Sequence, residues 1–223
     1  YAVVSVPLKL AVALGLALIL NLGVRGISVY RLLYYLPALV PPVAATIIFT
    51  LMFTPNAGPI NVFLEGIGIQ APLWLRDPPW AKPVLIMLSL WPLGIETLVF
   101  LAGLKEIPQD YLDAAALDGA GPWQRFRSIT LPLLSPVMLF NLVIGVIYSF
   151  QVFTQALVIG GTTGEPLEST LMFMVLIYRS AFRYFSMGYA AALSVILFLA
   201  VMGLTLLIFR TTRYWVHYEG GHQ

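Results

Sequence analysis

The stretch from Met187 to Phe209 has the sequence MGYAAALSVILFLAVMGLTLLIF. It contains no charged side chain, and as a helix it can cross the ~30 Å hydrocarbon layer of a bilayer, which takes roughly 20 residues. A strand of a membrane barrel would alternate apolar and polar side chains over ~10 residues, and the run from Val195 to Leu207 does not alternate. The stretch therefore predicts a membrane-spanning helix.

The whole chain has the composition of a membrane protein. Hydrophobic residues make up 60% of it and charged residues 10%, whereas about a quarter of the residues of a soluble domain are charged. The mean hydropathy is +0.90. We predict an all-α, polytopic transmembrane bundle with five spanning helices: Ala2 to Leu20, Leu32 to Phe53, Pro83 to Leu104, Leu131 to Val152, and Met187 to Phe209.

Composition also excludes several kinds of site. The chain has no cysteine, which rules out thiolate catalysis, disulfides and cysteine-ligated metals. Its two histidines, His217 and His222, lie in the polar tail, where we expect solvated side chains and no metal. The net charge of +2 and the lack of a basic run do not favour binding of nucleic acid.

The distribution of lysine and arginine predicts the orientation, because positive charges in short loops stay on the cytoplasmic side. One side would hold most of them, namely Arg25, Arg31, Lys105, Arg125, Arg127, Arg210 and Arg213. The other side would hold Arg76, Lys82, Arg179 and Arg183. This bias places the loop of residues 105–130 in the cytoplasm, within a membrane domain of residues 1–209, and it makes residues 210–223 a cytoplasmic tail.

Two short polar segments interrupt the apolar runs. Between the third and fourth predicted spans, Pro108 can open a helix at its first position, Gly119 and Gly121 break it, and Pro122 starts a second helix. Leu112, Ala115, Ala116 and Gly119 would share a face that packs on the chain's own helix ends or on a partner. Between the last two spans we expect a half-buried helix from Ser169 to Phe182.

The first of these segments resembles the EAA loop of ABC importer permeases. That pattern is Glu-Ala-Ala, two residues, Asp-Gly-Ala, and later Phe, Ile and Leu-Pro. Here it corresponds to Asp113-Ala114-Ala115, Asp118-Gly119-Ala120, Phe126, Ile129 and Leu131-Pro132. Position 113 departs from the pattern, since aspartate keeps the charge of glutamate but is one methylene shorter.

The resemblance implies an ABC importer type I permease fold and a mechanism. In that family the loop forms a coupling helix that docks on a separate ATP-binding subunit, which would involve Asp113, Ala114, Ala115, Asp118, Gly119, Ala120, Gly121 and Phe126. It implies as partners a second homologous permease subunit, two ATP-binding subunits, an extracytoplasmic solute-binding protein and the lipid bilayer of a bacterial or archaeal inner membrane. The chain has no P-loop, so ATP and magnesium would bind the partner ATPase, and we expect neither a cofactor nor an enzymatic activity on this chain.

Further stretches resemble the carbohydrate-uptake branch, the maltose-type and glycerol-phosphate-type permeases. They are Gly26 to Pro37, Gly58 to Asn61, Trp74 to Pro78, Phe153 to Thr170 and Gly188 to Ser194. The resemblance covers nearly the whole chain and implies one more helix ahead of Tyr1. In these permeases the sugar site lies in the helices flanking the loop, which implicates Trp91, Glu96, Tyr148, Ser149 and Gln151.

The sequence is compatible with more than one role for Glu96 and more than one cargo. Glu96 could hydrogen-bond a sugar or be a structural carboxyl bonded to another helix, since an ionisable group inside a span costs at least ~2.5 kcal/mol unless it is paired or wetted. The cargo could be a sugar or oligosaccharide, or glycerol phosphate or another polyol. A secondary transporter that works without ATP is a weaker alternative, because the sequence has no clear internal repeat.

Overall fold

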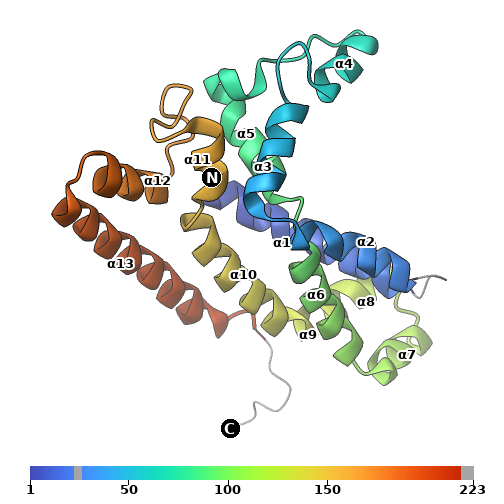
Figure 1. The fold of residues 1–223 in the computed structure, drawn as a ribbon. Helices are drawn as coiled ribbons and strands as arrows, with labels where there is room; N and C mark the ends of the chain where they lie inside the picture. The colour runs from blue at the N-terminus through green and yellow to red at the C-terminus, as the bar shows by residue number, and fades with distance from the viewer. Residues whose placement is uncertain (23–26, 217–223) are drawn as a thin grey trace. The chain divides into compact units, whose positions relative to one another are not determined.

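The computed structural model describes residues 1–22 and 27–216, and every regular element in that part of the chain is helical. Three described helical runs are long and apolar enough to cross a membrane (Figure 1). They are α1 (Ala2–Asn21), the run Ser135–Gly160 with α10 (Ser135–Phe150) and α11 (Thr154–Gly160), and α13 (Met187–Thr212). These runs confirm the first, fourth and fifth predicted spans. The bounds agree to within a few residues, except that the fourth run continues to Gly160 instead of ending at Val152.

The second and third predicted spans are each broken into two helices. α2 (Ile27–Leu39) and α3 (Pro42–Met52) are bent by 95°, and α5 (Pro78–Ser89) and α6 (Gly94–Glu106) by 50°. The spans predicted over Leu32 to Phe53 and Pro83 to Leu104 thus each consist of two helices. If each bent pair is one span, the described residues contain five.

Proline explains both breaks. Pro42 is the first residue of α3, and Pro41 before it has an extended backbone, with φ −53° and ψ 133°. Pro92 lies in the turn between α5 and α6. A proline ring lacks the N–H that would continue a helix, and it disfavours helical geometry in the residue before it.

The shorter helices lie in the loops. Between α3 and α5 are α4 (Pro59–Gly66) and the 3₁₀ turn η1 (Trp74–Arg76). Between α6 and α10 are α7 (Gln109–Leu117), α8 (Pro122–Arg125), the π-helical turn η2 (Phe126–Thr130) and α9 (Leu131–Leu133). Between α11 and α13 are α12 (Phe173–Tyr178) and the π-helical turn η3 (Arg179–Arg183).

The helix predicted from Ser169 to Phe182 begins instead at Phe173. The residues before it fold into a compact turn, in which the Thr170 hydroxyl donates to the Glu165 carbonyl at 2.8 Å and the Thr170 N–H to the Gly164 carbonyl at 3.2 Å. A Cβ at Gly164 would lie 2.7 Å from the Leu171 backbone nitrogen. This close backbone packing leaves no room for a helical start at Ser169.

The chain divides into two compact units. The first comprises Tyr1–Ser5, Leu39–Trp91 and Ile147–Met202. Within it, α3 packs on α11, and the Trp74 indole N–H donates to the buried Asn61 side chain at 2.5 Å. Two of the stretches that carry the family resemblance, around Asn61 and Trp74, are thus joined.

The second unit comprises Val6–Ala38, Pro92–Val146 and the residues from Gly203 onward. Its core joins the small residues of α1 to large side chains of α6 and to the residue between α9 and α10; it consists of Ala13, Ala17, Leu20, Phe100, Leu101, Leu104 and Leu134. Alanines on α1 let α6 approach closely, so that Phe100 is fully buried. This core lies next to the segment between α6 and α10.

Candidate functional site

The segment between α6 and α10 folds as the two short helices that its prolines and glycines predict. α7 begins at Gln109, one residue later than predicted, because Pro108 has an extended ψ of 130° and precedes the helix instead of opening it. Its first turn carries Asp110, whose charge favours a helix N-terminus. α7 ends at Leu117, before the two glycines.

A hydrogen-bonded cap defines the end of α7. Gly119 has a φ of +83°, in the left-handed region, and its N–H donates to the Ala116 carbonyl at 3.1 Å. The Ala120 N–H donates back to the Ala115 carbonyl at 2.9 Å. This pair of bonds is the Schellman motif, which favours glycine at the left-handed position. The Asp-Gly-Ala part of the family pattern therefore has a structural reason in this chain.

α8 begins with Pro122 in its first position, as predicted, and Gly121 before it has an ordinary φ of −68°. After Arg125 the chain continues without a loop through η2 and α9. The rings of Trp123 and Phe126 lie against each other, with centroids 5.5 Å apart. The predicted second helix thus extends past Ile129, partly in π-helical form.

The small-residue face predicted for α7 is divided between the chain itself and solvent. Leu112 and Ala115 are half-buried, whereas Ala116 and Gly119 are exposed. A groove of about 480 Å³ runs between α7 and the η2–α9 stretch. It is lined by Tyr111, Ala114, Ala115, Asp118, Ser128, Ile129, Pro132 and Leu133. The chain's own packing therefore covers only part of this face, and docking of the rest on a partner stays a prediction.

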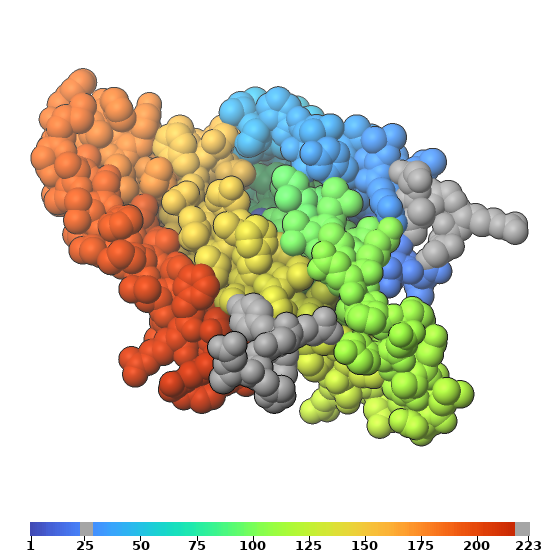
Figure 2. Space-filling view, turned by 90° about the horizontal axis from the view of Figure 1, so that it is seen from below, coloured from blue at the N-terminus to red at the C-terminus, as the bar shows by residue number. Residues whose placement is uncertain are grey.

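Apolar side chains are exposed at the outer end of this segment. Leu117 is 90% exposed and Trp123 is 72% exposed. Figure 2 shows the light-green atoms of this part of the chain at the molecular surface. Asp113, the residue that departs from the family pattern, is exposed on α7 and accepts a hydrogen bond of 3.3 Å from the Gln109 side chain.

The two helices that flank this segment are packed on each other. A Cβ added at Gly103 of α6 would lie 2.7 Å from the Val137 side chain and 3.0 Å from that of Leu134. Real Cβ atoms essentially never come as close as 2.7 Å, so α6 and α10 approach at Gly103 as closely as a glycine allows. The two helices that flank α7 and α8 are therefore held together at this point.

Four of the five predicted pathway residues belong to the first unit. The ring of Trp91 lies 5.5 Å from that of Phe49 on α3. Tyr148, Ser149 and Gln151 lie at the carboxyl end of α10, where Tyr148 is 64% exposed and Gln151 is also exposed. An exposed aromatic ring beside an amide is the kind of surface that binds a polyhydroxylated ligand.

The fifth, Glu96, belongs to the second unit and has a partner that the sequence did not reveal. Its carboxylate lies 3.8 Å from the Lys9 ammonium of α1, and both side chains are about a quarter exposed, at 26% and 23%. Neither of the two environments proposed from the sequence is an ion pair. Lys9 is the one cation within α1, and that position was the signal available in the sequence.

Residues 10–213 match the family described as "Binding-protein-dependent transport system inner membrane component". The chain belongs to this family. Its members are transport-system components of the inner membrane, so the chain is a membrane permease, as the EAA-like segment and the bundle of helices indicated.

Several relatives are similar over nearly the whole of this chain. It is 44% identical over 220 residues to "Probable ABC transporter permease protein YesP" of Bacillus subtilis, covering 98% of this chain and 71% of that protein. It is 36% identical over 213 residues to the "sn-glycerol-3-phosphate transport system permease protein UgpA" of Yersinia enterocolitica, covering 94% and 71%. It is 36% identical over 218 residues to the "Lactose transport system permease protein LacF" of Rhizobium radiobacter, covering 96% and 73%.

Two solved structures have the same fold. One is described as a bacterial ABC transporter involved in the import of the acidic polysaccharide alginate, with a TM-score of 0.83, 24% identity, and coverage of 95% of this chain and 76% of that one. The other is the alginate transporter in complex with a periplasmic protein that binds alginate pentasaccharide, with a TM-score of 0.84 and the same identity and coverage. They confirm the ABC importer permease fold expected from the sequence.

Proposed function

We propose that this permease forms half of the translocation pathway of an ATP-driven importer for a sugar or oligosaccharide, and that α7 and α8 connect it to an ATP-binding subunit. A second homologous permease subunit would form the other half. ATP and magnesium would bind two separate ATPase subunits, and an extracytoplasmic solute-binding protein would deliver the cargo. The observation that carries the proposal is the capped, exposed and rigidly attached α7–α8 segment.

The surface of this segment favours docking on a protein partner. Leu117 and Trp123 are apolar and mostly exposed. Leu117 is the last residue of α7, which is capped at Gly119, and Trp123 belongs to α8. Exposed apolar patches on ordered elements are typical of interaction sites, and buried aromatic anchors supply much of the energy of such interfaces. The groove beside Ala114 and Ala115 offers a concave surface next to these anchors.

The attachment of the segment favours transmission of motion. Because α6 and α10 are packed on each other at Gly103, neither can follow α7 without the other. The core around Phe100 and Leu134 adds α1 to the same group of helices. Closure of two ATP-binding subunits would then move these helices together and change the side of the membrane to which the pathway opens.

The identity of the cargo is proposed from the pathway residues and the relatives. Trp91, Tyr148, Ser149 and Gln151 provide aromatic, hydroxyl and amide groups, which suit a neutral polyhydroxylated molecule. Glu96 is paired with Lys9, so this pair adds little net charge to attract an anion. Relatives named for lactose and for sn-glycerol-3-phosphate support a sugar first and a polyol phosphate second.

Reconstitution tests the proposal. Proteoliposomes that contain this permease, its homologous partner and the ATPase subunits are supplied with the solute-binding protein and its radiolabelled ligand. We expect uptake to require ATP and to be lost when the Walker lysine of the ATPase is replaced. Undiminished uptake with the inactive ATPase would favour a secondary transporter instead. If only glycerol phosphate stimulates ATP hydrolysis, the cargo is glycerol phosphate and not a sugar.

A further inference from the structure

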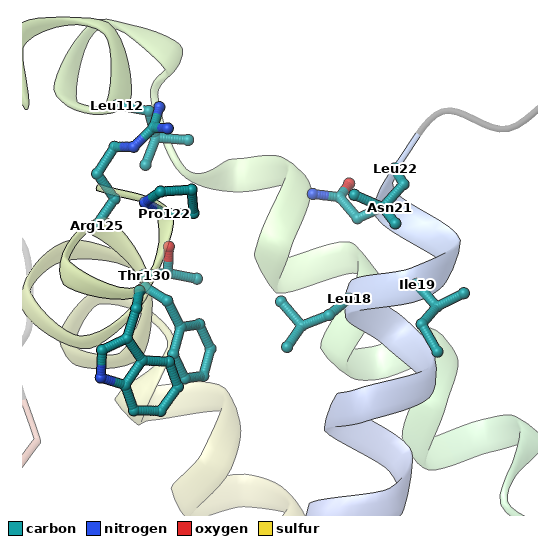
Figure 3. A pocket seen from close by; sticks show the side chains of 10 residues that line it. Leu18, Ile19, Asn21, Leu22, Leu112, Pro122, Arg125 and Thr130 are labelled. Carbon is teal, nitrogen blue, oxygen red and sulfur yellow. The ribbon is translucent and has the colours of Figure 1, made fainter. Parts of the chain in front are cut away.

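A second groove, of about 560 Å³, lies between the end of α1 and the α8–η2 stretch (Figure 3). It is separate from the groove beside Ala114, with which it shares no lining residue. Leu18, Ile19 and Leu22 line it from the last turns of α1, and Trp123 and Phe126 line it from the opposite side. Its walls are therefore mainly apolar, and their large side chains do not close over the space between them.

One cation is part of this apolar groove. Arg125 lines it, and in the described part of the chain its guanidinium forms no ion pair. Its Nε is buried and has no hydrogen-bond partner. Arg125 as a whole is half-exposed, but buried polar atoms are almost always hydrogen-bonded, so its Nε favours an anionic oxygen as its partner. The groove thus combines an apolar wall with a cation whose buried Nε has no hydrogen-bond partner.

The position of the groove restricts what can fill it. α1 is long and apolar enough to span a membrane, and the groove lies at its carboxyl end, which the charge distribution predicts to be cytoplasmic. Tryptophan is enriched at the level of the lipid headgroups, and Trp123 lies on this wall. The cytoplasmic leaflet carries anionic lipids, and basic pockets between membrane helices on this side bind their headgroups.

We propose that this groove binds one anionic phospholipid of the cytoplasmic leaflet, with an acyl chain between Leu18 and Phe126 and its phosphate at Arg125. The Asn21 amide and the Thr130 hydroxyl also line the groove and can donate to phosphate oxygens. Leu112 of α7 lines it too, so the lipid would contact both helices of the docking segment. The proposal depends on the membrane placement of α1 and not on transport activity.

Native mass spectrometry of the full-length permease tests this directly. The protein is titrated in detergent with phosphatidylglycerol or with phosphatidylcholine of the same acyl chains. We expect wild type to retain one phosphatidylglycerol more tightly than phosphatidylcholine. Arg125→Gln should lower this preference on the order of fivefold, as expected for one basic side chain near an anionic surface. Arg125→Lys should keep most of it.

Arg127→Gln is the matched control, because Arg127 is exposed two residues further along and does not line the groove. It should leave the preference unchanged. An equal preference in wild type and Arg125→Gln would overturn the proposal, and so would an equal loss in both glutamine variants. If Arg125→Gln keeps its lipid but loses the ATP-binding subunit, the groove is a protein interface and the lipid proposal is wrong. Measuring lipid binding without ATP keeps this result independent of the importer function.

Discussion

Replacement of Gly119 by alanine should weaken the cap at the end of α7 by a calculable amount. The residue has a φ of +83°, and a Cβ there would meet no atom within 4 Å, so the cost is backbone strain and not a clash. A left-handed conformation costs an L-residue roughly 1–2 kcal/mol. The two cap hydrogen bonds each contribute about 0.5–1.5 kcal/mol. The strain is therefore comparable to all that the cap contributes.

Hydrogen exchange of the permease in nanodiscs measures this loss at the Ala120 amide, which donates the cap bond to Ala115. Since about 1.4 kcal/mol is tenfold in an equilibrium constant, protection should fall roughly 5- to 30-fold in Gly119→Ala. Gly119→Asn should lose less, because asparagine tolerates this conformation better.

Gly121→Ser is the matched control for this measurement. Gly121 has a φ of −68° and open space at its Cβ, and serine is a preferred residue before a helix. Protection of the Ala120 amide should not change in this variant. Unchanged protection in Gly119→Ala as well would refute the capped geometry and the rigid segment inferred from it.

Three further predictions follow from the packing. Gly103→Ala forces a Cβ against Val137 and should destabilise the permease by about 1–3 kcal/mol, measured as a lower Tm. Gly15→Ala on α1 is the control, because its Cβ meets no atom within 4 Å and should not lower the Tm. Glu96→Gln should lower the stability of the protein by leaving Lys9 unpaired. The double variant Glu96→Gln, Lys9→Met should recover the lost stability. A double variant less stable than Glu96→Gln would contradict the pairing. Asn61→Leu removes the acceptor of the Trp74 indole and should cost about 1–3 kcal/mol in thermal unfolding, while Asn56→Asp, at an exposed turn with φ 65°, should change little.

The sequence predicted those features that depend on local chemistry. The uncharged run of α13 is long enough to span a membrane, and this helix was confirmed. Around α7 and α8, prolines lack a backbone N–H and glycines favour helix ends, and the two short helices that they predict were confirmed as well. The prolines at 41 and 92 allow either a bend or a continuous span, and the sequence alone does not decide between them, because neighbouring helices determine whether a proline is tolerated.

Features that depend on tertiary contacts could not be predicted from one sequence. The partner of Glu96 is on another helix, far along the chain, and no spacing rule connects it to Lys9. Ala115 is half-buried and Ala116 exposed on the same helix, a difference that depends on the rest of the fold. The histidines of the tail, His217 and His222, and Arg25 of the first loop lie outside the described residues, so the expectations for them stay predictions.

Photocrosslinking from single cysteines tests most directly the claim that α7 and α8 dock on an ATP-binding subunit. The chain has no cysteine of its own, so a single introduced cysteine can be labelled specifically. Leu117, on the docking segment, is 90% exposed. Leu167, in the loop between α11 and α12 on the predicted external side, is 84% exposed and serves as the control. In the reconstituted importer, a photoreactive maleimide on Leu117→Cys should crosslink the ATP-binding subunit, and the same reagent on Leu167→Cys should not. Crosslinking of that subunit from neither position, or only from Leu167→Cys, would contradict the account.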